Sequence, residues 1–238
     1  MHLCWVKIEI CAASIDALVG AQNLRVDRVE VCSSLEIGGV TPSLGFIQSA
    51  LHLGLSTHVL LRPRPGGFVY SQSELDLIFE EINVLNRLNV QGLVVGVLTP
   101  ELRIDRKSME RIRTSFTGEL TFHRAFDDLV EWRTEMDCLK SIGVNRILTS
   151  GLANSVTRGL PILQEMVLHA KGQIQIMAGG GVNLANAQEL LSTVKPDAIH
   201  FSATSKESLE PQSFFSEERL VFDSLKAKKL VDLCRNFS

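Results

Sequence analysis

The chain has 238 residues, of which 45% are hydrophobic, and this length suits one (β/α)8 barrel, which needs about 250 residues. Its net charge of −3 gives no general attraction to nucleic acid or anionic membranes, and no apolar run reaches the roughly 20 residues of a membrane span. The first residues are typical of a strand rather than a signal peptide, and five cysteines are too few for a disulfide framework, so we expect a cytoplasmic protein.

The first two predicted strands, residues 6–11 and 28–32, share one pattern. Side chains alternate between the faces of a strand, so Glu9 and Cys11 lie on one face of the first, and Glu30 and Cys32 on the matching face of the second. The other faces are apolar. In a barrel, we expect the apolar faces to pack on helices and the polar faces to point inward.

The same alternation of strand and helix continues along the chain. The predicted strands are 6–11, 28–32, 57–64, 92–98, 121–126, 146–151, 174–181 and 198–203. The predicted helices are 14–23, 42–53, 73–88, 105–116, 132–142, 154–170, 183–191 and 220–233. Eight such units favour a single α/β domain, residues 1–238, closed as a TIM-type barrel.

Two further features qualify this architecture. No predicted strand is followed by a full G-x-G-x-x-G turn, so we expect neither a doubly wound sheet nor a nucleotide cofactor. Residues 204–218 are polar and unpatterned apart from Phe214 and Phe215, which predicts a long loop before the closing helix. An apolar pair in such a loop is compatible with an interface in a homo-oligomer.

Cys11 and Cys32 end neighbouring strands at matching positions, and adjacent strands lie about 4.8 Å apart. Two thiolates at that separation are able to hold one metal ion, and a soft pair with few other ligands suits Cu(I) better than structural zinc, which takes four. The alternative is that both thiols are small buried apolar groups, as free cysteines commonly are.

Charged residues cluster at other strand ends. Glu9, Glu30, Arg62 and Arg64 are interpreted either as a charged floor that neutralises itself or as a site with a catalytic carboxylate. His123 and His200 also end strands, where a histidine serves as general base, metal ligand or structural residue.

The stretch TFHRAFD, residues 121–127, runs from an apolar strand directly into His123, Arg124 and Asp127. Charged side chains are rarely buried without partners, so this strand is expected to open into a site. Gly180, Gly181, His200 and Ser202 fall at the ends of the last two strands, where barrels often bind phosphate, although glycines there also permit tight turns.

Taken together, these stretches resemble the CutC family of copper homeostasis proteins. The matching pieces are EIC at 9–11, DRVEVC at 27–32, GGVTPS at 38–43, RPR at 62–64, YS at 70–71, TFHRAFD at 121–127, RILTSG at 146–151, MAGGGV at 177–182 and IHFSA at 199–203. The resemblance implies a TIM-type barrel, a cytoplasmic homo-oligomer (dimer or tetramer) and Cu(I) binding at the cysteines that match Cys11 and Cys32. It implies no particular reaction.

The sequence departs from the family pattern in two loops. Ile37 stands where the family usually has an acid before GGVTPS, and Gly67 stands where it usually has Asp after RPR. An acidic side chain is therefore lost or displaced in each loop.

Two functions follow as hypotheses. The first is a cytoplasmic Cu(I)-binding or trafficking protein that uses Cys11 and Cys32. The second is an enzyme that acts on a small phosphate- or carboxylate-bearing substrate, with Arg62, Arg64 and Arg124 as binding residues and His123, Glu30 or Asp127 as catalytic candidates. Fold alone does not decide between them.

Overall fold

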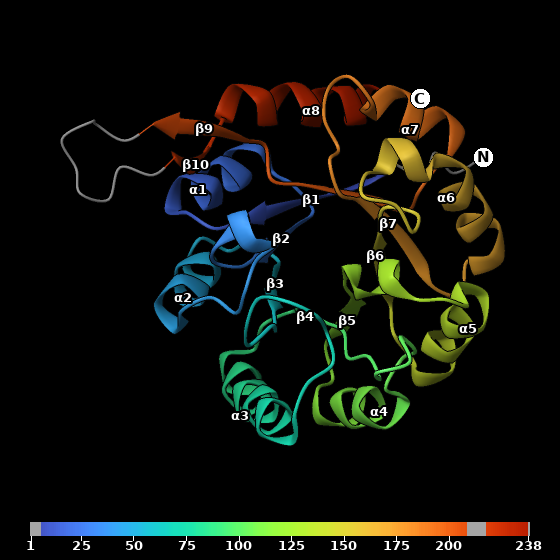
Figure 1. The fold of residues 1–238 in the computed structure, drawn as a ribbon. Helices are drawn as coiled ribbons and strands as arrows, with labels where there is room; N and C mark the ends of the chain where they lie inside the picture. The colour runs from blue at the N-terminus through green and yellow to red at the C-terminus, as the bar shows by residue number, and fades with distance from the viewer. Residues whose placement is uncertain (1–5, 209–217, 238) are drawn as a thin grey trace.

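The computed structural model describes residues 6–208 and 218–237. Eight parallel strands form a closed barrel in chain order, with the first strand paired to both the second and the eighth. Figure 1 shows this barrel nearly end-on, with the helices arranged around it. The prediction of a single TIM-type barrel is therefore confirmed.

Apart from the first, the barrel strands are shorter than predicted, because the chain leaves the sheet before Arg62, His123 and Ser202. Their bounds are β1 Lys7–Ala12, β2 Arg28–Val31, β3 Thr57–Leu60, β4 Gly92–Val95, β5 Glu119–Phe122, β6 Arg146–Thr149, β7 Gln175–Gly179 and β8 Ala198–Phe201. Arg62, His123 and Ser202 thus lie in the loops that leave the carboxyl ends.

The surrounding helices are α1 Ile15–Leu24, α2 Leu44–His52, α3 Gln72–Leu88, α4 Arg106–Ser115, α5 Trp132–Ile142, α6 Val156–Ala170, α7 Ala187–Thr193 and α8 Ser224–Asn236, with short 3-10 turns η1 Leu35–Ile37 and η2 Arg124–Asp128. Serine caps fix several starts: the Ser14 hydroxyl accepts from the Ala17 N–H, and Ser71 forms a capping box with Glu74. The second helix begins after Ser43, which caps it, and not at Pro42 as predicted.

The two faces of the strands separate as the alternation predicts. Ile8 and Ile10 are fully buried in the core that the helices cover. Glu9 and Cys11, between and after them, point into the barrel, where Glu9 contacts Arg28 and Cys11 contacts Glu30. Because the interior is filled with side chains, chemistry is available only at the ends of the barrel.

The prediction of an unpatterned loop at 204–218 is wrong at both of its ends. Thr204–Ser208 forms β9 and Glu218–Phe222 forms β10, an antiparallel pair that lies beside α1 (Figure 1). The closing helix consequently begins at Ser224, capped by Asp223, and residues 220–222 belong to the hairpin. Phe214 and Phe215 lie outside the described residues.

Candidate functional site

The carboxyl ends of the barrel strands surround a pocket of about 310 Å³. Residues at the carboxyl ends of the strands and in the loops that follow them line it: Cys11, Glu30, Leu35, Gly38, Leu60, Arg62, Phe68, His123, Arg124, Leu148, Gly180, Gly181, Val182, His200, Phe201 and Ser202. The volume lies at the lower end of the range of small-molecule pockets, about 300–1,000 Å³. Most of the predicted site residues therefore gather at one place.

Cys11 and Cys32 lie side by side at this end of the barrel. Their sulfurs are 3.4 Å apart, and both side chains are buried. The pairing of β1 with β2 produces this contact, because Cys11 is opposite Glu30 and the Cys32 N–H donates to the Ala12 carbonyl one step further along. Two thiols are thus close enough for one ion to bridge them.

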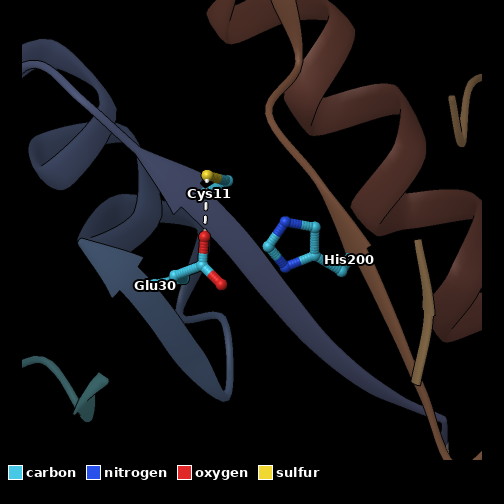
Figure 2. A group of neighbouring side chains, drawn as sticks. All are labelled: Cys11, Glu30 and His200. Carbon is cyan, nitrogen blue, oxygen red and sulfur yellow. Dashed lines mark hydrogen bonds between the residues drawn. The ribbon is translucent and has the colours of Figure 1, made fainter. Parts of the chain in front are cut away.

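Glu30 and His200 form a second donor group with Cys11. One possible ligand atom from each of Cys11, Glu30 and His200 lies within 4.8 Å of the others. Figure 2 shows the three side chains converging from β1, β2 and β8, with the Cys11 thiol donating to Glu30 Oε1 at 3.3 Å. Sulfur, carboxylate and imidazole therefore face one small volume.

Glu9 orients the His200 ring through a hydrogen bond that it accepts from the ring nitrogen Nδ1. Its carboxylate, fully buried, accepts from His200 Nδ1 at 2.8 Å and from Arg28 Nε at 2.9 Å. Burial alone would raise the pKa of Glu9, but the hydrogen bond from His200 and the charges of His200 and Arg28 outweigh it and lower that pKa. A ring that donates through Nδ1 keeps Nε2 for a ligand.

The pKa values of His200, Glu30 and Cys11 depend on burial and on the neighbouring carboxylates. Burial lowers the pKa of His200, but the Glu30 and Glu9 carboxylates outweigh it and raise that pKa. Burial raises the pKa of Glu30. The hydrogen bond with Cys32, together with burial and the neighbouring Glu30, raises the pKa of Cys11 well above its ordinary value.

His123 lies on the opposite wall of the pocket. The Ala125 N–H donates to its Nδ1 at 3.2 Å, and its ring packs against Phe68 with centroids 4.7 Å apart. Burial, reinforced by the charge of Arg62, lowers the pKa of His123 to about 3. His123 is therefore a neutral imidazole at physiological pH.

The predicted charged floor of Glu9, Glu30, Arg62 and Arg64 is not what the structure contains. Glu9 pairs with Arg28 and His200, and Glu30 contacts Cys11. Arg62 donates to backbone carbonyls, whereas Arg64, outside the pocket lining, pairs with Glu74. The candidate role of Arg64 in anion binding loses its geometric basis, because its guanidinium is already bound to Glu74 and to the carbonyls of Gly67 and Val69.

Arg124 and Asp127 are bound to each other at the edge of the pocket. Arg124 Nε donates to Asp127 at 2.9 Å, and Asp127 also accepts from Thr149 Oγ1 and from the N–H groups of Ser150 and Leu152. These bonds occupy both carboxylate oxygens, which favours a structural role for Asp127 over the catalytic one. Gly180 lies beneath Arg124, at φ +103, and a Cβ there would come within 3.0 Å of the guanidinium carbon.

Arg28 and Phe68 are the functional-site residues that the sequence reasoning did not single out. The charge of Arg28 on the inward face was a usable signal, because an inward arginine beside Glu9 requires a carboxylate partner. Phe68 gave no signal, since a single aromatic residue after two glycines is common in loops. Its position over Arg62, 5.1 Å from the guanidinium carbon, depends on the fold of the loop.

Comparison with known proteins identifies the relatives of this chain. The sequence profile of the CutC family matches residues 6–205. CutC family proteins from Glaesserella parasuis and Vibrio atlanticus are 39% and 38% identical, over 83% and 84% of this chain and 82% of each relative.

Solved structures agree with this relationship. A protein provisionally described as the copper homeostasis protein CutC, from Streptococcus agalactiae, superposes with a TM-score of 0.78 at 32% identity, covering 83% of this chain and 98% of that one. The phosphoribosylanthranilate isomerase of Pyrococcus furiosus, with a TM-score of 0.59 at 14% identity over 97% of this chain and 99% of that one, is similar in fold alone.

Proposed function

The chain belongs to the CutC family of copper homeostasis proteins, and from that premise we propose that it binds Cu(I) through Cys11 and Cys32 at the carboxyl-end face of the barrel. The single observation that carries this proposal is the 3.4 Å separation of the two sulfurs. Thiolates are soft ligands that select Cu(I) among the metals a cell offers.

The distance between the two sulfurs favours a Cu(I) site with more than two ligands. Metal–sulfur bonds of about 2.3 Å place two sulfurs about 4.6 Å apart when collinear and about 4 Å apart in trigonal or tetrahedral geometry. A separation of 3.4 Å therefore needs only a small side-chain rotation to reach the trigonal arrangement. His200 or Glu30, which both form a donor group with Cys11, would supply the third ligand.

His200 has the surroundings of a metal-binding histidine. Such histidines usually donate their other ring nitrogen to a carboxylate, which fixes the ring and raises its basicity. Glu9 is that carboxylate, 2.8 Å from Nδ1. Glu30 Oε2, buried and without a hydrogen-bond partner, is a further donor that a bound cation would satisfy.

The proposal is tested by an anaerobic Cu(I) titration against a chromogenic chelator. We expect the Cys11→Ser/Cys32→Ser double variant to bind Cu(I) more than about 100-fold more weakly than the wild type, since loss of outer partners alone costs roughly 10–100-fold. Cys138→Ser is the matched control, because Cys138 lies on α5, outside the pocket lining. Unchanged affinity in the double variant, or equal losses in the two proteins, would contradict the assignment.

We also propose that the protein works in a reducing, cytoplasmic compartment and as a homo-oligomer. The paired thiols support the first point, because they require reduction to bind a metal. The family resemblance supports the second. No helix in the described part of the chain is both long and apolar enough to cross a bilayer.

A further inference from the structure

Two buried nitrogen atoms without hydrogen-bond partners belong to residues that line the same pocket. They are Arg62 Nε and His123 Nε2. Buried polar groups are nearly always paired in native proteins, because an unpaired one costs about 1–3 kcal/mol. Unpaired groups that meet at one pocket therefore indicate a ligand that pairs with them.

Arg62 is the more unusual of the two. Its side chain is 7% exposed, and its two terminal nitrogens donate to the carbonyls of Ile37, Gly39 and Gly66. These acceptors are neutral, and within the described ranges Arg62 forms no ion pair with a carboxylate, unlike Arg28, which pairs with Glu9. A buried charge without a counter-ion is costly, so an anion that accepts from the unpaired Nε would be favoured beside Arg62.

The contacts of Arg62 are made by the two loops in which the sequence lacks an acid. Ile37 supplies one acceptor carbonyl, and Gly66, next to Gly67, supplies another. The loops thus enclose the guanidinium with backbone oxygens and offer it no carboxylate from those two positions. The Arg62 charge remains available to the pocket.

His123 adds a neutral donor on the same wall. Its Nδ1 accepts the Ala125 N–H, so the proton of the neutral ring is on Nε2. Arg62 and His123 both pack on Phe68, at 5.1 Å from the guanidinium carbon and 4.7 Å between ring centroids. Arg62 Nε–H and His123 Nε2–H are therefore two unpaired donors whose side chains both contact the Phe68 ring.

We propose that this pocket binds a small organic anion, whose carboxylate or phosphate oxygens accept from Arg62 Nε and His123 Nε2. The cavity of about 310 Å³ has room for a small metabolite and excludes a polymer. Arg124, Gly180 and Gly181 line the same pocket and would contact the remainder of the molecule. The two anion donors are distinct from the sulfur ligands, although Cys11 lines the same pocket.

The test uses three small anions as probes: inorganic phosphate, glycerol 3-phosphate and malonate, with uncharged glycerol as the blank. Nuclear magnetic resonance of arginine-labelled protein follows the Nε–H signal of Arg62, and calorimetry measures affinity. We expect at least one anion, and not glycerol, to shift that signal and to bind with a dissociation constant at or below the millimolar range. A preference for malonate or for the two phosphates identifies the oxyanion.

Two variants assign the binding to the proposed donors. Arg62→Gln removes the charge, and we expect at least about tenfold weaker binding, the loss typical of a hydrogen bond to a charged group. His123→Phe keeps a ring beside Phe68 but removes the donor, and we expect about fivefold weaker binding, as for a neutral hydrogen bond. Arg133→Gln is the matched control, since Arg133 is exposed and pairs with Glu165.

Several results would overturn the proposal. One is an Arg62 signal in the wild type that no anion shifts, a measurement that requires no variant to fold. Another is equal weakening in Arg62→Gln and Arg133→Gln, which would indicate a general charge effect. Cu(I) affinity measured in the same variants keeps the two sites apart, because we expect Arg62→Gln to leave it unchanged.

Discussion

At the scale of single residues, Glu9 links the donor group of Cys11, Glu30 and His200 to the interior of the barrel. It lies between Arg28 on β2 and His200 on β8, and its side chain has no exposure to solvent. The alternation of β1 predicted that Glu9 points inward, but it did not predict either partner. His200 is 191 residues away in sequence, so only closure of the barrel brings it to Glu9.

Replacement of Glu9 by glutamine is expected to destabilise the protein. The change keeps the shape of the side chain but leaves Arg28, 5% exposed, without its counter-ion. Removal of one partner from a buried ion pair typically costs about 3–5 kcal/mol in the free energy of unfolding. Urea unfolding measures this loss, and Glu110→Gln, which breaks the exposed pair with Arg106, is the control with a much smaller change.

Glu9→Gln is also expected to lower the pKa of His200, because a carboxylate that raises it is removed. A resonance titration of the imidazole follows that pKa directly. If the variant unfolds at the wild-type urea concentration and His200 titrates as before, Glu9 does not hold the histidine.

The two buried neutral histidines predict a loss of stability in acid. Burial lowers the pKa of His58 to about 4 and that of His123 to about 3, from an ordinary value of 6.5. Between each lowered pKa and 6.5, the histidine is protonated in the unfolded chain but neutral in the folded protein. The free energy of unfolding therefore falls as the pH falls below 6.5. His200 and Glu30, whose pKa values are raised, act in the opposite direction.

Comparison of the wild type with His123→Phe isolates the contribution of His123 to the pH dependence of stability. Urea unfolding between pH 7 and pH 5 should show a shallower decline in the variant, since one source of proton uptake on unfolding is removed. Parallel declines in the two proteins would show that His123 titrates normally in the folded state.

The hairpin of β9 and β10 is the main departure at the scale of elements. Both strands are short, β9 is polar, and the apolar residues of β10 continue the helical periodicity of the closing helix back to Leu220, so no local pattern predicted the hairpin. Tertiary contact explains it: Leu220 and Phe222 line a second cavity together with Cys11 and with Ala17 of α1. The eight barrel units were predictable because each carries its own apolar period.

Gly20→Ala is expected to displace this hairpin. Alanine normally stabilises a helix by about 1 kcal/mol relative to glycine. In α1, however, a Cβ at residue 20 would lie 2.2 Å from the Phe222 ring, so we expect faster hydrogen exchange at the amides of β9 and β10 and a lower melting temperature. Gly45→Ala in α2 is the matched control, because a Cβ there has no neighbour within 4 Å among the described residues, and it should be neutral or stabilising.

At the scale of the whole molecule, the two ends of the barrel hold different kinds of polar group. The carboxyl end has the pocket with the sulfur pair and the unpartnered nitrogens of Arg62 and His123. The amino end has a cavity of about 320 Å³ lined by charged and amide side chains, where Arg146, 1% exposed, donates to Thr121, Glu119 and Gln175, so each of its three side-chain nitrogens has a partner. Barrels generally place function at the first end and stability at the second.

Sequence reasoning placed most of the candidate residues at the carboxyl end of the barrel, where the structure has them, because alternation and strand order fix the register. It did not predict which charges pair. Arg62 and Arg64 are two residues apart and were interpreted together, yet Arg64 binds Glu74 from the start of α3, whereas Arg62 faces the pocket. That difference arises from the path of the loop between them and α3, which no periodic pattern describes.

Replacement of Arg146 by methionine tests whether the amino end of the barrel contributes to stability and not to metal binding. The change leaves the Thr121 hydroxyl buried without its donor, so we expect the free energy of unfolding to fall by about 1–3 kcal/mol. Arg146 starts β6 at the end away from Cys11 and Cys32, so we expect Cu(I) affinity to stay at the wild-type value in protein that remains folded. The Cys11→Ser/Cys32→Ser variant should show the opposite pattern, with stability largely kept and affinity lost. A fall in Cu(I) affinity in the folded Arg146→Met protein would show that the amino end of the barrel also shapes the metal site.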